Sequence, residues 1–223
     1  MTRFPPPAAA QSVEVPLCPL SDFYGYDRGT PIDRRYLEGF LHAHTDLVNG
    51  AVLEVKDDAY TRRFGAGRVR RSTVVDIDPT NQQATLIADL GQPGNLPAGA
   101  FDCIICTQTL QFIPTPHTAL ANLQAALAPG GALLLTVPCL SRTSVGLPAS
   151  DYWRWTPAGL RALLGQRWRG PVTVQGLGNL RACVGFLLGE AAEELPPAIL
   201  AVVDPAFPLV ACAAARRPRA QLP

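Results

Sequence analysis

Four carboxylates of this chain follow segments that have the sequence pattern of buried strands. They are Glu54, Asp76, Asp78 and Asp89. Ligands of open α/β sheets bind beyond the carboxyl ends of the strands, and carboxylates accept hydrogen bonds from hydroxyl and amino groups. The sequence therefore predicts one polar ligand site built from these acids. The apolar stretch 52–55, which includes the first acid, lies where a nucleotide-binding α/β enzyme places its first cofactor loop.

Segments with strand and helix patterns alternate along the chain, which indicates a parallel sheet covered on both faces. Expected strands cover 52–55, 72–77, 84–88, 101–106, 132–137, 172–175 and 207–213, and expected helices cover 31–48, 118–127, 156–164 and 180–194. Thr30 is expected to cap the first helix, with Pro31 in its first turn. We expect an α/β fold with a Rossmann-like doubly wound sheet of about seven mostly parallel strands. Its C-terminal strand is antiparallel, and helices cover both faces.

The chain has 223 residues and a net charge of +1. This length fits one domain, expected over 21–215, between a proline-rich flexible arm at 1–20 and a tail at 216–223. The near-neutral charge gives no reason to expect nucleic acid or an anionic membrane as a partner. Without an apolar run of membrane-spanning length or a signal peptide, we expect a cytoplasmic protein.

Cys103 and Cys106 form a C-x-x-C pair inside an apolar stretch. Residues three apart on a strand point to opposite faces, so this spacing does not suit a metal or redox site. We expect both thiols to be buried and reduced, and we expect no metal.

The order of these motifs resembles the class I S-adenosylmethionine (SAM) methyltransferases. The resemblance rests first on LEVKDDAYTRRFG, FDCIICTQTLQFI and LAPGGALLLTVP. The segments GTPIDRRYLEGFL, DYWRWT and GEAAEEL extend it to a bacterial group like the type 11 methyltransferases, whose members often accompany glycosyltransferase or secondary-metabolite genes. The resemblance implies SAM as the cofactor.

The acids acquire specific roles from this resemblance. Glu54, beside Val55, is implied to hold the amino group of SAM. One of Asp76 and Asp78 is implied to bind the ribose hydroxyls, with Asp76 favoured by the V-D-I-x-P pattern. Each acid also has a simpler interpretation, as a helix cap, a turn former or a solvated loop residue.

Further cofactor contacts are implied after the third and fourth strands. Asp89 corresponds to the residue that accepts a hydrogen bond from the adenine amino group, with the amide of Leu90 beside it. Thr107 and Gln108 are implied to line the floor of the site near the reactive methyl group.

Lys56 departs from the family pattern, because the first glycine of the cofactor loop is expected at its position. Glycine there permits a close backbone approach and positive φ. A lysine side chain turned inward would place a second positive charge near the sulfonium of SAM, whereas one turned to solvent would interfere little. The sequence leaves both orientations open.

Candidates for the acceptor side come from the segment DYWRWT, which follows the fifth strand and recurs in relatives thought to act on sugars. Asp151 is a candidate general base or hydroxyl ligand, and Tyr152 is a candidate stacking residue. Alternatively, Asp151 caps the helix region that begins near Thr156. Phe112 occupies the place where many small-molecule relatives have a histidine base.

The sequence thus favours SAM-dependent methyl transfer to a small-molecule acceptor, most plausibly to an oxygen of a sugar or secondary metabolite. Two alternatives keep the fold but change the function. One is an enzyme of other chemistry, such as a cyclisation or elimination, with Lys56 as the catalytic group. The other is a non-catalytic partner of a biosynthetic enzyme. A homodimer and a monomer are both compatible with the sequence.

Overall fold

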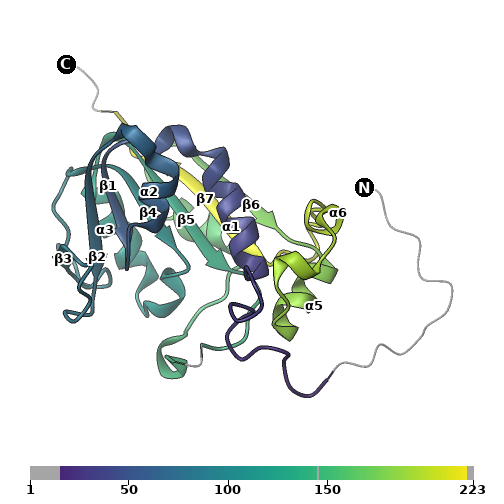
Figure 1. The fold of residues 1–223 in the computed structure, drawn as a ribbon. Helices are drawn as coiled ribbons and strands as arrows, with labels where there is room; N and C mark the ends of the chain where they lie inside the picture. Colours follow the sequence, from purple (N-terminus) through teal and green to yellow (C-terminus); the bar gives the residue numbers. More distant parts are fainter. Residues whose placement is uncertain (1–15, 145, 220–223) are drawn as a thin grey trace.

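The computed structural model describes residues 16–144 and 146–219, and its centre is a seven-stranded sheet (Figure 1). The strands are β1 (Gly50–Val55), β2 (Val69–Asp76), β3 (Leu86–Ile87), β4 (Phe101–Thr107), β5 (Leu127–Pro138), β6 (Val172–Leu177) and β7 (Val210–Arg216). The helices are α1 (Ile32–Ala43), α2 (Ala59–Gly65), α3 (Pro116–Ala126), α4 (Pro157–Gly165), α5 (Leu180–Leu188) and α6 (Pro197–Leu200).

The strand order is β3-β2-β1-β4-β5-β7-β6. Strands β1 to β5 pair in parallel, and β7 runs antiparallel to both β5 and β6. The chain winds outward from β1 to β3 and then returns to build the other half from β4. The point of reversal between β1 and β4 is where an open α/β sheet binds its ligand. The predicted doubly wound fold with antiparallel C-terminal pairing is confirmed.

Alternate residues of the central strands bury against different helices, because successive side chains of a strand point to opposite faces. Cys103 and Ile105 pack in a cluster with residues of α1 and α5. Ile104 and Cys106 pack in a second cluster with residues of α3 and α4. The prediction that the two cysteines of the C-x-x-C pair face opposite sides is confirmed, and both are free, buried thiols.

Several predicted element boundaries are wrong. The first helix begins at Ile32 rather than Pro31, and it ends at Ala43 rather than 48. Thr30 does not cap it; instead, the Thr30 carbonyl accepts a hydrogen bond from the amide of Ala192. The helix predicted over 180–194 ends at Leu188, because Gly189 takes up a left-handed conformation there. The last strand lies at 210–216 rather than 207–213.

The ends of the described chain are tied to the domain. Most of the predicted arm at 1–20 lies outside the described residues, but the amide of Leu20 donates to the carbonyl of Leu188 at 2.6 Å. In the predicted tail at 216–223, Arg216 still belongs to β7. The Arg217 backbone bonds with Gly130 and Gly131. The last four residues lie outside the description.

Over the described parts of the chain, none of the helices combines the length and apolar character needed to cross a membrane.

Helix α2 was not predicted, because the sequence after the first strand reads as a turn. Its first amides are satisfied by acids that precede it: Asp57 Oδ1 accepts from Ala59 N at 2.9 Å, and Glu54 accepts from the next two amides. A short helix of seven residues has little intrinsic stability. These caps, together with the burial of Phe64, therefore define it.

The turn between β1 and α2 passes through Lys56 with a φ of +78°. Glycine reaches this left-handed region without strain, whereas a residue with a Cβ does not. The backbone is held there by two contacts. Lys56 N donates to Val75 O at 2.9 Å, and Lys56 O accepts from Asn81 Nδ2 at 2.7 Å. The position therefore has the backbone of the missing family glycine although it carries a lysine.

We predict that Lys56→Gly raises the free energy of unfolding by about 1 kcal/mol, since it relieves the left-handed strain. Urea denaturation measures this change. Lys56→Ala is the matched control, because it removes the charge but keeps the Cβ, and it should give no such gain. Equal gains in both variants would assign the effect to the charge and contradict the backbone explanation.

Candidate functional site

A cleft of about 1250 Å³ opens at the carboxyl ends of β1, β2 and β4. Ligand pockets commonly measure about 300 to 1000 Å³, so this cleft has room for a cofactor and a second small molecule. It is bordered by all the residues predicted to bind the cofactor, namely Glu54, Val55, Lys56, Asp76, Asp78, Asp89, Leu90, Thr107 and Gln108. The structure thus brings together residues that four different segments contribute.

Glu54 is the most buried acid of the cleft, with 2 % of its surface exposed. Its two carboxylate oxygens accept from the amides of Tyr60 at 3.1 Å and Thr61 at 2.6 Å. Burial raises the pKa of Glu54 to about 7, although the hydrogen bonds from Thr61 and Tyr60 act in the opposite direction. Each oxygen retains a second lone pair, so Glu54 can still accept a hydrogen bond from a ligand in the cleft.

Asp76 and Asp78 follow one another at the end of β2, but they differ in exposure. Asp76 is half-buried, and its carboxylate accepts from Asn81 Nδ2 at 2.6 Å and from the amide of Asp78 at 3.1 Å. Asp78 is exposed, and hydrogen bonds from Thr80 lower its pKa. The Asn81 amide group also binds Lys56 O, so it joins the turn after β1 to the acid after β2.

Asp89 borders the cleft after β3. Its Oδ1 accepts from the amide of Gly91 at 2.7 Å. Leu90 is buried, and its carbonyl accepts from Asn122 Nδ2 of α3 at 2.8 Å. These contacts hold the turn in place and leave Asp89 Oδ2 available to a ligand.

The floor of the cleft includes two glutamines whose amide groups are incompletely paired. Gln108 has a φ of +46° and donates its backbone amide to Thr136 O at 2.9 Å. Its buried Nε2 has no hydrogen-bond partner among the described residues, and neither has the buried Oε1 of Gln111. Tyr24, Lys56 and Gln108 border the cleft as non-glycine residues with positive φ. Such strain gathers at functional sites.

Asp151 borders the cleft but is engaged by its own loop. Arg154 forms a bidentate ion pair with it at 2.6 and 2.9 Å, and Ser144 N donates to Oδ2 at 2.8 Å. The hydrogen bond from Arg154 lowers the pKa of Asp151. A carboxylate so paired is a weak base, and this geometry favours a role in shaping the loop. Asp151 does not cap the following helix, α4. The cap is Thr156, whose side chain accepts a hydrogen bond from Gly159 N.

Tyr152 does not border the cleft. Its side chain is exposed, and its amide donates to Gln111 O at 2.9 Å. That bond fixes the backbone of Tyr152 against the floor segment of the cleft. The aromatic residues that do border the cleft include Phe23, Tyr26 and Tyr60.

Sequence reasoning missed the part of the cleft that α1 contributes. Asp33, Arg34 and Glu38 border it, beside Tyr26 and Tyr60. Burial raises the pKa of Asp33, with Arg34 acting against the shift. The sequence held a signal for this part of the cleft. Three adjacent charged residues, Asp33, Arg34 and Arg35, fall in the first turn of the predicted helix, where the two arginines oppose the helix dipole.

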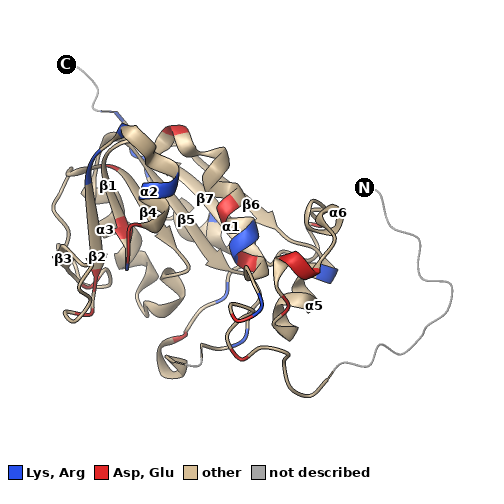
Figure 2. Ribbon diagram, in the orientation of Figure 1, with Lys and Arg blue, Asp and Glu red and all other residues tan. Residues whose placement is uncertain are grey.

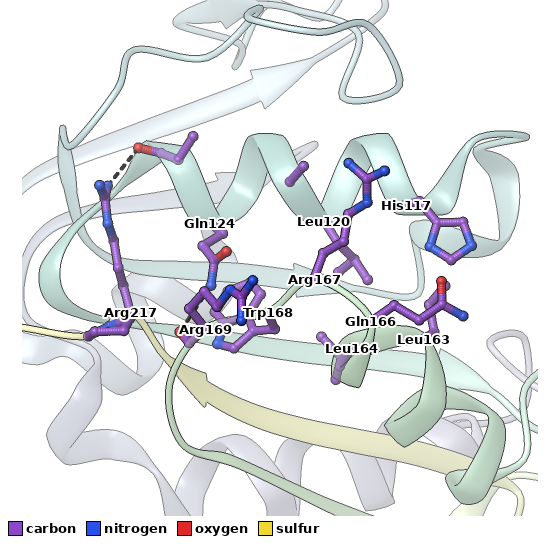
Figure 3. A pocket seen from close by; sticks show the side chains of 13 residues that line it. His117, Leu120, Gln124, Leu163, Leu164, Gln166, Arg167, Trp168, Arg169 and Arg217 are labelled. Atoms are coloured by element: carbon purple, nitrogen blue, oxygen red, sulfur yellow. Dashed lines mark hydrogen bonds between the residues drawn. The ribbon is translucent and has the colours of Figure 1, made fainter.

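A second hollow, of about 680 Å³, lies away from these acids, between α3 and the end of α4. His117, Gln124, Arg167 and Trp168 line it (Figure 3). Of the described residues that border the main cleft, none is a histidine. His117 therefore belongs to a different surface from the predicted cofactor-binding residues.

Comparisons with known proteins agree with this fold. No curated protein matches the chain in sequence. Among solved structures, the chain resembles the N-methyltransferase NodS from Bradyrhizobium japonicum WM9 in complex with S-adenosyl-L-homocysteine, with a TM-score of 0.56, 16 % identity, and 90 % of this chain and 94 % of that chain covered.

Two further structures share the fold. The 1,6-didemethyltoxoflavin-N1-methyltransferase from Burkholderia thailandensis has a TM-score of 0.55 and 18 % identity, with 82 % of this chain and 77 % of that chain covered. The [4+2]-cyclase SpnF has a TM-score of 0.56 and 16 % identity, with 86 % and 84 % covered. Residues 26–181, well over half of the chain, match the family model of the methyltransferase domain. The chain therefore belongs to the methyltransferase-domain family.

Proposed function

We propose that this protein transfers a methyl group from SAM to a small-molecule acceptor. The observation that carries the proposal is that Glu54, Asp76 and Asp89 come from the ends of three adjacent strands and border one cleft at the reversal point of the sheet. Family membership and the solved neighbours with S-adenosylhomocysteine support this reading. When bound, SAM supplies an electrophilic methyl group on a sulfonium.

Each acid has a chemical partner in this proposal. Glu54 accepts from the amino group of the cofactor through its remaining lone pairs. Asp76 binds the ribose hydroxyls, favoured over the exposed Asp78 because it is half-buried in the cleft. Asp89 accepts from the adenine amino group through Oδ2, beside the amide of Leu90. Backbone and side chains at Thr107 and Gln108 form the floor toward the acceptor.

On the acceptor side of the cleft, we expect binding and orientation of the acceptor to supply most of the rate of methyl transfer. Methyl transfer gains much of its rate from holding two reactants in line. Asp151 is already paired with Arg154, so we assign it to shaping the loop over the cleft. An oxygen acceptor on a sugar or secondary metabolite fits a cleft that combines aromatic side chains with charged ones.

A second candidate function is a cyclisation or elimination on the same fold. The structural likeness to the [4+2]-cyclase SpnF favours it, together with the lack of a histidine among the described cleft residues. In this alternative, Lys56 is the candidate catalytic group, since its exposed side chain lies at the cleft.

We predict that the native protein binds S-adenosylhomocysteine and that Asp76→Asn weakens this binding roughly 10- to 100-fold. Loss of a charged hydrogen-bond acceptor costs about 1.5 to 3 kcal/mol. Isothermal titration calorimetry measures both proteins. Asp46→Asn is the matched control, because Asp46 is exposed and does not border the cleft.

The same titration on Lys56→Gly separates the two candidate functions. Binding by both native protein and variant supports the methyl-transfer proposal and means that Lys56 does not interfere with cofactor binding. Binding only by the variant would mean that the lysine closes a former cofactor site, and it would leave the second candidate. The methyl-transfer proposal is wrong if neither protein binds.

The affinity for S-adenosylhomocysteine should rise with pH and level off above about 7. In the free protein, burial raises the pKa of Glu54 to about 7. A ligand ammonium beside this carboxyl group favours the charged form and lowers its pKa. Binding therefore releases a proton below pH 7, and affinity increases by at most about tenfold per pH unit there. Calorimetry between pH 5.5 and 8 tests this expectation, with Glu54→Gln as a control that should show no such slope.

A further inference from the structure

The edge of the sheet opposite the cofactor cleft is rich in arginine. The amino ends of the parallel strands lie at this edge, and three short segments bring basic side chains to it: 68–71 at the start of β2, 167–169 between α4 and β6, and 216–219 at the end of β7. Figure 2 shows basic segments near the C-terminal end of the described chain and acidic ones in the turn after β2, at the other edge. The near-neutral net charge of +1 is therefore the sum of two edges of unlike charge.

The hollow between α3 and the end of α4 is the recessed part of this edge (Figure 3). Its buried apolar lining consists of Leu120, Leu163, Leu164 and Trp168. Its polar lining consists of His117, Gln124, Gln166, Arg167, Arg169 and Arg217. Of the described residues that border it, none is an acid. We call this surface the basic hollow, because it combines an apolar floor with a cationic rim.

The indole ring of Trp168 anchors the turn that carries two of the rim arginines. Trp168 is 8 % exposed, and its Nε1 donates to Arg216 O at 3.1 Å. Its neighbours Arg167 and Arg169 are exposed, so one guanidinium lies on each side of a buried ring in the sequence. Figure 3 shows that the Arg167 side chain extends toward α3, whereas the Arg169 side chain lies by Trp168. An anchored backbone therefore presents both cations at the rim.

The rim arginines have donors that the protein does not use. In the described parts of the chain, no carboxylate oxygen lies within 4.0 Å of the guanidinium nitrogens of Arg167, Arg169 or Arg217. Arg217 donates from Nη1 to the carbonyls of Ala125 and Leu127, and a guanidinium has five N–H donors. Like charges that gather at one hollow repel each other. Carboxylates bound there would relieve this repulsion through charge-assisted hydrogen bonds.

The lining of the basic hollow favours a polypeptide over a bilayer or a nucleic acid. The exposed large apolar side chains of the described chain border other surfaces, so the hollow has no side chain to insert into a membrane. Its aromatic residue, Trp168, is buried and does not offer a face on which successive bases stack. Arginine pairs well with carboxylates, and an apolar side chain between two acids would lie on the leucines of the floor.

A second copy of this chain is a less suitable partner than a different protein. Acids that a second copy would supply, such as Asp76 and Asp78, border its cofactor cleft, so docking would cover that cleft. The contact would also join two different surfaces, and such head-to-tail contacts form rings or open filaments rather than a two-fold dimer. A separate protein with an acidic segment satisfies the rim charges without either consequence.

We propose that the basic hollow is the docking site for an acidic segment of a partner protein. Carboxylates of the segment bind Arg167 and Arg169, and an apolar side chain between these carboxylates lies on the floor beside Trp168. The site lies at the edge of the sheet away from the cofactor cleft, so it does not depend on the proposed function.

The test titrates the full-length protein with a short peptide in which glutamates flank a central leucine, by isothermal titration calorimetry. Native protein should bind it with a Kd no weaker than about 1 mM. Arg167→Glu and Arg169→Glu should each weaken binding roughly 10- to 100-fold, since a carboxylate contact is lost and a like charge is introduced. Arg35→Glu is the matched control, because Arg35 is exposed and borders neither the basic hollow nor the cleft.

Two further comparisons separate the rim from the floor. A peptide with serine in place of the leucine should bind native protein about tenfold more weakly, because it leaves the apolar floor uncovered. Arg167→Gln removes the charge without reversing it and should weaken binding less than Arg167→Glu. The substituted arginines are exposed, so all variants should keep the native Tm.

Several results would overturn the proposal. One is the absence of peptide binding by native protein, and another is an equal weakening in Arg35→Glu, which would assign binding to net charge rather than to the hollow. A third is preferential binding of phosphatidylserine vesicles or of an oligothymidylate that Arg167→Glu abolishes. Self-association of native protein that Arg167→Glu abolishes, measured by sedimentation velocity, would instead assign the hollow to a second copy.

Discussion

The carboxylate of Glu54, at the end of β1, is the contact on which the cleft depends. It accepts hydrogen bonds from the amides of Tyr60 and Thr61 and thereby starts α2 directly beyond β1. Helix α2 has only seven residues, too few to be stable by itself in water. A buried acid is costly, and its raised pKa records that cost. Two backbone hydrogen bonds offset this cost. Because its pKa is raised to about 7, the carboxyl group of Glu54 can gain or lose a proton near neutral pH.

The turn that carries the chain from Glu54 to α2 shows how the fold accommodates an unusual residue. Lys56 holds the positive φ that glycine would hold, because its amide and carbonyl are both fixed by neighbours from β2 and the turn after it. Its side chain is exposed, so the position keeps the path of the backbone without filling the cleft. A change of residue type at this loop therefore alters the charge at the rim more than the shape of the site.

Ion pairing divides the charged residues of the cleft into paired and free groups. Asp151 is neutralised by Arg154, and Glu38 is neutralised by Arg63. Arg34 on α1 is balanced by the nearby Asp33 and by the phenol of Tyr60, whereas Glu54 at the cofactor end has no ion pair among the described residues. Since an unpaired charge in a buried site is costly, a cationic ligand group beside Glu54 would stabilise the ionised carboxylate. The loop of DYWRWT thus contributes shape to the cleft.

The sequence by itself determined the sheet and the placement of the acids after β1, β2 and β3, because apolar strand patterns and the carboxyl-end rule depend only on local order. It also determined that Cys103 and Cys106 face opposite sides, since strand periodicity fixes this. Only the tertiary structure decided that α2 forms, because its cap is a side chain from another element. It likewise decided that Asp151 is paired with Arg154. Several acids and arginines lie near one another in sequence, and which of them meet depends on how α1, α2 and the loop after β5 pack around the cleft.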